Sequence, residues 1–301
     1  MLRLAHLSDV HLAPLPRPGL GDVSVKRALG YINWHRNRKR MHLRPVLDEL
    51  IDDLSRQSPN HIAVTGDLVN IGLPREYLAA RRWLESLGRP SEVSVVPGNH
   101  DAYVRLKGDP GFGRWADFMR PLGPGSDVAP ASHRFPYLRR IGDVVLIGLS
   151  SARPTPPFVA AGRLGRRQRA DFARLLGELG REGVCRVVLI HHPPLPGQAD
   201  RRRGLGDAGE LAEILAREGA ELVLHGHNHT QSLAWGEGPG RPVPVVGVPS
   251  ASIGWPDHKP LARYNLFTIA ARKGAAPEIE MIGRGLTPGD AGVRELERIR
   301  F

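Results

Sequence analysis

Six short apolar runs in this chain each lead into a group of polar residues, and this arrangement constrains the fold more than any other feature. The runs are rich in Val, Ile and Leu, and they read "LRLAHLSD" (2–9), "HIAVTGD" (61–67), "EVSVVPGNHD" (92–101), "VVLIGLSS" (144–151), "RVVLIHH" (186–192) and "ELVLHGHNH" (221–229). Their length and composition predict strands that are buried on both faces of a sheet. Helices must cover both faces of such a sheet, so we expect an α/β fold.

Helical patterns separate several of these runs. Apolar residues recur at helical spacing from Leu43 to Leu54, which predicts an amphipathic helix packed on a sheet. Asp207 and Glu210 have the spacing of a capping pair at a helix start, and Gly219 stands where that helix should end. The alternation of strand and helix patterns supports the α/β interpretation.

The pattern changes after His229. Strand-like runs are then separated by Gly and Pro turns with no helical pattern between them, which predicts a β-meander over about 231–301 that closes a second sheet. The tail "GDAGVRELERIRF" (289–301) is interpreted as a short terminal helix. Because no linker divides the chain, we expect one domain over 1–301 with a basic insert at about 17–44.

The composition indicates a soluble globular protein. A chain of 301 residues with 41% hydrophobic and 24% charged residues can bury a substantial core. The single cysteine, Cys185, cannot form an internal disulfide. No run approaches the roughly 20 apolar residues that a transmembrane helix requires. These features together predict a cytoplasmic protein.

Carboxylates, imidazoles and one amide follow five of the predicted strands. Ligands collect at the carboxyl ends of strands in open α/β sheets, so these side chains should meet in one site. Carboxylates and imidazoles bind first-row divalent ions, and two ions held close together need an anionic bridge. The absence of thiolates favours Mn, Fe or Zn in a catalytic site over a structural zinc site. The residues concerned are Asp9, His11, Asp67, Asn99, His100, Asp101, His191, His192, His225, His227 and His229.

The spacing within these groups is informative. Asp9 and His11 stand two residues apart, as do His227 and His229. Residues two apart in a strand point to the same face, so each pair should direct both side chains into one site. Glycines at 66, 98 and 226 should allow the backbone to approach closely at the turn out of each strand.

The ordered set of strand ends resembles the signature of the calcineurin-like metallophosphoesterase family. The matching motifs are Asp9-x-His11, Gly66-Asp67, Gly98-Asn99-His100-Asp101, His191 and Gly226-His227-x-His229. The resemblance extends from about residue 3 to residue 230, and the set is most similar to the bacterial branch of cyclic-nucleotide and glycerophosphodiester phosphodiesterases. It implies a four-layer αββα sandwich, in which two mixed sheets are flanked by helices.

The resemblance also implies a role for each motif residue. Two divalent ions would be held by two sets of ligands, Asp9, His11 and His229 for one ion and Asn99, His191 and His227 for the other. Asp67 would bridge the ions, His100 would protonate the leaving oxygen, and Asp101 would orient His100. His191 is preferred to His192 because the family ligand stands two residues before a turn residue, here Pro193. His225 precedes the glycine and is interpreted as a supporting histidine inside the strand.

The function expected from this resemblance is hydrolysis of P–O bonds with a binuclear metal centre. A small phosphodiester, such as a cyclic nucleotide or a glycerophosphodiester, is the expected substrate. The alternatives are a hydrolase of lipid-linked phosphate or pyrophosphate at a membrane surface, a nuclease, and a scaffold without catalysis. A scaffold would have lost metal ligands, whereas this chain retains all seven and His100.

The segment 17–44 bears on these alternatives because it is strongly basic. It holds eight basic residues against one acidic residue, in a chain with a net charge of +11. The segment could be a cap whose cations steer phosphate esters into the site. It could also bind an anionic membrane surface, or grip nucleic acid through its interleaved Tyr31, Ile32 and Trp34. The sequence alone ranks the cap first, the membrane second and nucleic acid last.

Overall fold

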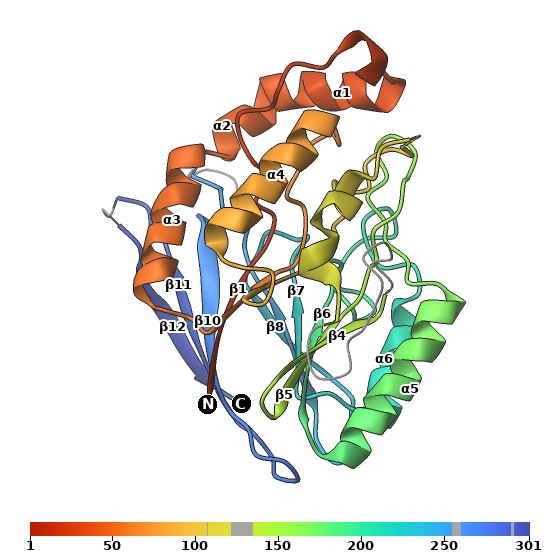
Figure 1. The fold of residues 1–301 in the computed structure, drawn as a ribbon, viewed down its shortest axis with the longest axis vertical. Coiled ribbons are helices and arrows are strands. Elements are labelled where there is room, and N and C mark those ends of the chain that lie inside the picture. Colours follow the sequence, from red (N-terminus) through yellow and green to blue (C-terminus); the bar gives the residue numbers. More distant parts are fainter. Residues whose placement is uncertain (107, 122–134, 255–259, 290–291) are drawn as a thin grey trace.

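Two mixed six-stranded sheets lie face to face in this protein, and helices cover their outer faces (Figure 1). The computed structural model describes residues 1–301 except 107, 122–134, 255–259 and 290–291. The four layers confirm the predicted αββα sandwich. Among the described residues, no helix is both long and apolar enough to cross a membrane.

The first sheet has the strand order β12-β11-β10-β1-β2-β3. Its strands are β1 (Leu2–Leu7), β2 (His61–Val64), β3 (Val93–Val95), β10 (Arg263–Ala270), β11 (Glu278–Gly285) and β12 (Arg294–Arg300). Strands β1, β2 and β3 run parallel, whereas β10 pairs with β1 in the antiparallel direction. The carboxyl ends of β1, β2 and β3 therefore lie at one edge of the sheet.

The second sheet has the strand order β4-β5-β6-β7-β9-β8. Its strands are β4 (Tyr137–Ile141), β5 (Val144–Gly148), β6 (Cys185–Leu189), β7 (Leu222–His225), β8 (Ser232–Gly236) and β9 (Val243–Gly247). Strands β5, β6, β7 and β9 are parallel, and every residue of β5, β6 and β7 is buried. The prediction of strands buried on both faces is confirmed for this sheet.

Helices from four segments cover the sheets, and a further group of helices forms the basic insert. The covering helices are α3 (Arg44–Arg56), α4 (Pro74–Leu87), α5 (Arg166–Glu182) and α6 (Ala208–Glu218). In Figure 1, α3 and α4 lie on the side of the first sheet, and α5 and α6 lie on the opposite side of the molecule. The insert consists of η1 (Leu20–Asp22), α1 (Val25–Asn33), the π-helical turn η2 (Trp34–Arg38) and α2 (Lys39–Met41). A further 3-10 segment, η3, spans Gly111–Met119.

The core has two parts, and both hold the strand ends in place. The larger part joins the two sheets and the α3 side, for example through Leu4, Leu50 and Val187. The smaller part packs α5 and α6 against the outer face of the second sheet, for example through Phe172 and Val188. Burial of this kind of apolar surface stabilises a fold by about 25 cal/mol per Å². The strand ends therefore project from a rigid frame.

The C-terminal part of the chain differs from its prediction in two ways. The strand-like runs after His229 do not close one sheet, because β8 and β9 join the second sheet while β10, β11 and β12 join the first. The predicted terminal helix is wrong, because the tail forms the edge strand β12. Its side chains alternate in exposure from Leu296 to Arg300, with Glu297 and Ile299 the less exposed. This two-residue period fits a strand, and it outweighs the helical preference of Arg, Glu and Leu.

The predicted helices in the middle of the chain are present, with one change. Helix α3 buries Leu47, Leu50 and Leu54, as the apolar spacing predicted. Helix α6 begins after Asp207 and ends before Gly219, but the Asp207 side chain does not cap it. The carboxylate accepts hydrogen bonds from the backbone N–H of Leu164 and Gly165 instead. Asp207 therefore ties the start of α6 to the loop before α5.

Candidate metal centre

The polar residues predicted to form a site are brought together at the carboxyl ends of strands from both sheets. Asp9 and His11 follow β1, Asp67 follows β2, and Asn99 follows β3 in the first sheet. The second sheet supplies the remaining residues, His191 after β6 and His227 and His229 after β7. The two sheets are joined at this edge by a bridge between Ser8 and Ser250 and by the hydrogen bond from Ala251 N–H to the Ser8 carbonyl.

The direction of these side chains is set by left-handed backbone turns and not by the alternation of side chains along a strand. Strand β1 ends at Leu7 and β7 ends at His225, so the paired residues lie beyond the strands. Among the described residues, seven other than glycine have a φ between +41° and +68°, and five of them are predicted metal ligands. They are Asp9, His11, Asp67, His227 and His229. The side chains do converge, as predicted, but the predicted cause, the alternation of side chains along a strand, is wrong. Strained backbone of this kind gathers at functional sites, where the surrounding fold holds it in place.

Glycines allow the strand ends to approach each other, as predicted. A Cβ atom at Gly226 would overlap the side chains of Ser8 and Asp9. A Cβ atom at Gly98 would overlap Asp67, and Gly66 has a φ of +94° and lies against the Gly98 backbone. These three positions have no space for a larger residue.

The first group of candidate ligands consists of Asp9, His11 and His229. One potential ligand atom from each residue lies within 4.8 Å of the others. His229 Nε2 is 3.1 Å from Asp9 Oδ1, and the other oxygen of Asp9 accepts a hydrogen bond from the His227 N–H at 2.8 Å. His11 Nδ1 donates to the Val69 carbonyl at 3.2 Å, so Nε2 is the acceptor atom of the ring, and it accepts from Arg38 at 2.8 Å.

The second group is centred on His191. Its Nε2 atom lies 3.1 Å from Asn99 Oδ1 and 3.2 Å from His227 Nδ1. Its Nδ1 atom donates to the Thr65 carbonyl at 2.6 Å. A backbone carbonyl that accepts from one ring nitrogen fixes the tautomer and presents the other nitrogen as a ligand. His11 and His191 share this arrangement.

Asp67 lies between the two groups. Its Oδ2 atom is 3.8 Å from His11 Nε2 and 3.5 Å from His191 Nε2. Its Oδ1 atom accepts a hydrogen bond from the His100 backbone N–H at 2.7 Å, which fixes the carboxylate plane. One oxygen of Asp67 therefore faces a histidine from each group.

The protonation of these residues suits a cation at the site. Burial, the Arg38 guanidinium and neighbouring histidines hold the pKa of His11 well below its usual value, and burial has the same effect on His227. Both side chains are then neutral, which is the form that binds metal. Burial alone would lower the pKa of His191, but the Asp67 carboxylate outweighs it and raises that pKa to about 9. A positive charge is thus favoured next to Asp67.

The donor set fits divalent metal ions on three observations. Among the residues that the structure describes, four overlapping groups of three ionisable residues place their ligand atoms within 4.8 Å of each other, one of them with His192 and another with His100. The buried His227 Nε2 atom has no hydrogen-bond partner within the described part of the chain. Nitrogen and carboxylate oxygen atoms bind Zn²⁺ and similar ions at about 2.0–2.2 Å, which ligands at this mutual spacing can reach.

The two ambiguous histidines have other partners. His192 uses both ring nitrogens, with Nδ1 2.7 Å from Ser151 Oγ and Nε2 2.9 Å from the Ala160 carbonyl. This geometry favours His191 as the ligand of the pair. His225 lies inside β7, where its Nδ1 atom is 3.0 Å from the Gly226 carbonyl. It is absent from the groups of candidate ligands found among the described residues.

His100 lies beside the metal-ligand candidates, but its partners differ from the prediction. Its Nδ1 atom is 2.5 Å from the Asn70 carbonyl, and its Nε2 atom is 3.0 Å from an Arg38 nitrogen. The predicted partner, Asp101, accepts hydrogen bonds at 2.8–3.2 Å from four backbone N–H groups instead, those of Asp67, Leu68, Val69 and Gly98. The orienting role predicted for Asp101 is thus corrected. Asp101 holds the loops around Asp67, and the Asn70 carbonyl orients His100.

The insert places Arg38 over the centre, a position that its sequence context does not mark. The Arg38 guanidinium donates to His11 Nε2 at 2.8 Å and to His100 Nε2 at 3.0 Å. From the same insert, the His42 ring meets the His11 ring edge to face at 4.5 Å between centroids. Neither residue could be distinguished within a run of basic residues, because only the fold shows which cation faces inward. Burial and the nearby Arg38 lower the pKa of His100 to about 4.

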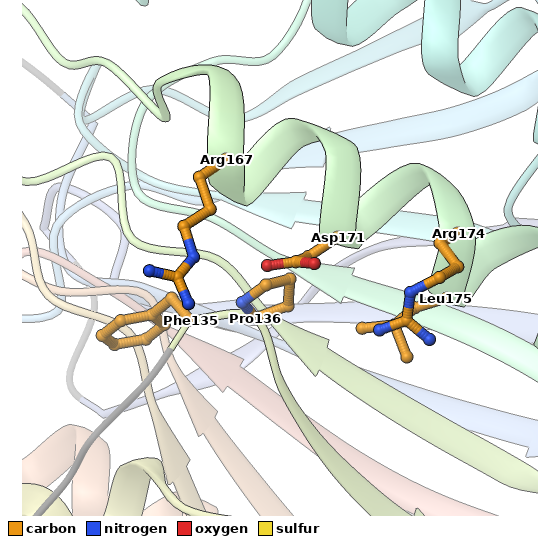
Figure 2. A pocket seen from close by; sticks show the side chains of 6 residues that line it. All are labelled: Phe135, Pro136, Arg167, Asp171, Arg174 and Leu175. Atoms are coloured by element: carbon orange, nitrogen blue, oxygen red, sulfur yellow. The ribbon is translucent and has the colours of Figure 1, made fainter.

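A cavity of about 290 Å³ opens above the candidate ligands. Its lining includes Arg38 from the insert and Arg203 from the loop before α6, together with Asp67, Asn99 and His100. A different cavity of about 510 Å³ shares no lining residue with the first. It is lined by Arg167, Asp171 and Arg174 of α5 and by the segment before β4 (Figure 2). None of the predicted site residues lines that second cavity, so the chemistry belongs to the first.

The sequence matches the model of one protein family, described as calcineurin-like phosphoesterase, over residues 2–231. A probable cyclic nucleotide phosphodiesterase of Synechococcus sp. is 26% identical over 242 residues, which cover 79% of this chain and 76% of that protein. The glycerophosphodiester phosphodiesterase of Enterobacter lignolyticus is 29% identical over 233 residues, which cover 76% of this chain and 72% of that protein.

Solved structures share the fold. A dimetal phosphatase from Danio rerio superposes with a TM-score of 0.61 at 14% identity, covering 99% of this chain and 98% of that chain. A purple acid phosphatase from yellow lupin (Lupinus luteus) superposes with a TM-score of 0.59 at 11% identity, covering 99% of this chain and 53% of that chain. At this level of identity the likeness shows the fold alone.

Proposed function

The chain belongs to the calcineurin-like phosphoesterase family and is a metal-dependent phosphoric ester hydrolase, and we propose that it hydrolyses small phosphodiesters at a centre of two divalent metal ions. The family membership confirms the resemblance predicted from the ordered strand ends. The preference for diesters is supported by the two curated relatives, which are named as phosphodiesterases of cyclic nucleotides and of glycerophosphodiesters.

The observation that carries this proposal is the position of Asp67 between two groups of ligands. One of its oxygens lies 3.8 Å from His11 Nε2 and 3.5 Å from His191 Nε2. A carboxylate with this placement can bridge two cations that are a few Å apart. The proposed ligands are Asp9, His11 and His229 for one ion and Asn99, His191 and His227 for the other. When bound, such ions lower the pKa of a shared water and offset the charge of the phosphoryl oxygens.

The protein side chains then have three tasks. The first is to place a proton at the departing oxygen, and His100 is suited to it because it lines the cavity while the Asn70 carbonyl holds Nδ1. Nε2 accepts from Arg38 at 3.0 Å, so it can give a proton only after Arg38 has turned to a phosphate oxygen and the ring has taken up a proton. A positioned imidazole acid contributes about 10²- to 10⁴-fold to such a reaction. A phosphate anion in the cavity would oppose the effect of Arg38 on the His100 pKa.

The second task is to bind the phosphoryl oxygens, and the cavity offers two guanidinium groups for it. Arg38 comes from the insert, and Arg203 comes from the loop before α6, where it donates to the His227 carbonyl at 3.4 Å. Guanidinium groups match the geometry of phosphate oxygens through paired hydrogen bonds. This arrangement supports the interpretation of segment 17–44 as a cap over the site.

The third task is to hold the ligands in place beyond the strand ends, where strand pairing no longer fixes the backbone. Asp101 performs it by accepting four backbone hydrogen bonds from the turns that carry Asp67 and Asn99. Burial and the Asp67 carboxylate raise the pKa of Asp101 to about 7, so these bonds are valued as ordinary ones, at about 0.5–1.5 kcal/mol each. We therefore assign Asp101 to the support of the centre and not to proton transfer.

The proposal can be tested by hydrolysis assays on protein that has been stripped of metal and reloaded with Mn²⁺. The substrates are bis(p-nitrophenyl) phosphate, as a diester, and p-nitrophenyl phosphate, as a monoester. We expect the diester to be hydrolysed with the higher kcat/KM and the activity to disappear on chelation. Hydrolysis of neither substrate, or a higher kcat/KM for the monoester, would contradict the proposal.

A further inference from the structure

A second groove adjoins the metal-site cavity and is built from different residues. It has a volume of about 420 Å³. It shares part of its lining with the metal-site cavity, namely Asn33, Arg38, Asn99, His100, Ala160 and Arg203. The rest of its described lining is mainly apolar or aromatic, with Leu29, Tyr103, Pro157, Phe158 and Val159. The groove is therefore continuous with the place where the phosphate would lie.

Phe158 is the most unusual residue of this groove. Its side chain is 83% exposed, although a phenylalanine ring is normally buried. Its φ is +63°, a left-handed backbone that it shares, among the described non-glycine residues, with Ser58 and the five predicted metal ligands. An exposed aromatic ring on a strained backbone costs free energy in the folded protein, and such costs persist at binding sites. We take this as the sign that the ring has a ligand.

The groove is preformed by contacts between the insert and the two loops that face it. Lys26 Nζ of α1 donates to the Tyr103 carbonyl at 2.8 Å and to the Thr155 carbonyl at 2.9 Å. The Thr155 hydroxyl in turn donates to the Val159 carbonyl at 2.5 Å, which closes the turn that presents Phe158. A ligand would not have to order these loops on binding, which favours affinity.

The position of His100 decides which part of a substrate would enter the groove. His100 lines both cavities, and its ring stacks on Tyr103 with 5.4 Å between centroids and 21° between planes. The proposed role of His100 is to protonate the departing oxygen. The organic group attached to that oxygen must then extend past His100 into the groove.

The charge of the groove excludes one class of substrate. Its described lining has three cationic side chains, Lys26, Arg38 and Arg203, and no carboxylate. A cationic headgroup, such as choline or ethanolamine, would be repelled by these charges. A planar, uncharged aromatic group can stack on exposed rings, as bases do on aromatic side chains.

We propose that this groove binds the base of a nucleoside-bearing phosphodiester and that Phe158 is the stacking residue that sets this specificity. The inference rests on the proposed function, because it takes the phosphate position and the role of His100 from it. Phe158 is a specificity-determining residue, and its substitution should leave the metal ligands in place.

The test compares cyclic AMP with glycerophosphoglycerol, a diester whose headgroup has neither a positive charge nor a ring, as substrates of the Mn²⁺-loaded protein. We expect Phe158→Ala to lower kcat/KM for cyclic AMP about tenfold, mainly through KM, since about 1.4 kcal/mol of lost stacking corresponds to a factor of ten. The same variant should leave kcat/KM for glycerophosphoglycerol within about twofold. Phe158→Tyr keeps a ring and should retain the activity on cyclic AMP.

A binding titration with AMP separates failure of this inference from failure of the proposed function. If the unchanged protein hydrolyses neither substrate, the proposed function fails, yet weaker AMP binding by Phe158→Ala than by Phe158→Tyr would still support the groove. Equal losses on both substrates, or equal AMP binding by the two variants, would overturn the inference.

Discussion

Two regions of this molecule meet at the candidate active site, and they are built in different ways. The metal edge comprises the seven proposed ligands at the strand ends, Asp9, His11, Asp67, Asn99, His191, His227 and His229. The outer wall comprises Arg38, Tyr103, Phe158 and Arg203, which come from the insert and from long loops. The metal edge is buried and fixed by hydrogen bonds to backbone groups, whereas the outer wall is partly exposed.

This difference shows how one fold can keep the residues that carry out the reaction apart from those that select the substrate. Strand ends hold the metal edge because parallel strands and the packed core allow little movement there. Loops form the outer wall, and loops can change in sequence and length without loss of the core. Substitutions in the metal edge should therefore abolish hydrolysis of every ester, while those in the outer wall should affect some substrates more than others.

The largest effect is expected from Asp67→Asn, which breaks the metal edge at its bridge. The amide cannot supply the negative charge between two cations, so we expect kcat to fall by at least about 10⁴-fold, as several kcal/mol are lost. The measurement is kcat for the diester and for the monoester. Asp171→Asn, on α5 at the other cavity, is the control and should keep full activity. A residual kcat above about a tenth of the normal value would contradict the bridging role.

His100→Ala tests the boundary between the two regions. We expect kcat to fall by about 10²- to 10⁴-fold because the acid for the leaving oxygen is lost. The metal content should stay unchanged, since His100 is not a proposed ligand. Elemental analysis of the purified variant checks this point, and loss of metal would refute the assigned role. His35→Ala, which alters an exposed histidine of the insert, is the matched control.

Arg38→Gln tests the outer wall directly. Loss of a charge-assisted hydrogen bond worth about 1.5–3 kcal/mol should lower kcat/KM by about 10- to 100-fold, with metal content unchanged. Arg36→Gln removes an exposed charge from the same insert and should change kcat/KM by less than about twofold. If both variants lose activity equally, the insert acts through its overall charge and Arg38 has no special place.

The smallest effect concerns a site that belongs to neither region. The buried Asp53 carboxylate accepts hydrogen bonds from Tyr264 Oη at 2.7 Å and from Arg284 Nε at 2.7 Å. Although burial alone would raise the pKa of Asp53, the bonds from Arg284 and Tyr264 outweigh it and hold that pKa below its usual value. We expect Asp53→Asn to lower the free energy of unfolding by about 2 kcal/mol at pH 7, with kcat unchanged.

The pH dependence of this effect has a definite sign. Because the folded-state pKa of Asp53 is lowered, its stabilisation is fully present above the unfolded-state pKa of about 3.9. The stabilisation is lost as the pH falls through the folded-state pKa. Urea unfolding of both proteins should therefore give a constant difference between pH 5 and pH 7 that shrinks below about pH 4. A difference that grows on acidification would show that the carboxylate is not ionised in the fold.

The same comparison explains how much could be predicted from the sequence. The metal edge was predictable because polar residues follow buried strands in a fixed order, so Asp9, Asp67 and His191 could be expected to meet. The outer wall was not predictable, because nothing local distinguishes Arg38 from Arg36 or marks the exposed ring of Phe158. Arg38 becomes a site residue because it ends a π-helical turn, and the packing of the buried Trp34 in that turn directs it inward.

Two errors in the sequence analysis have physical reasons. Strand alternation does not direct Asp9 and His11, because their strand ends at Leu7 and a left-handed turn follows, which composition does not reveal. The terminal segment is a strand although its Arg, Glu and Leu residues favour helices, because pairing with β11 places it in the sheet. In both cases tertiary contacts outweighed the local preference.

The most direct test of the central claim is a count of the metal ions in the metal edge. The chain is loaded with Mn²⁺, freed of excess ion by gel filtration and analysed for bound metal per chain. We expect two ions per chain in the unchanged protein and a marked loss in Asp67→Asn. One ion or none in the unchanged protein, or two ions in both proteins, would contradict a binuclear centre bridged by Asp67.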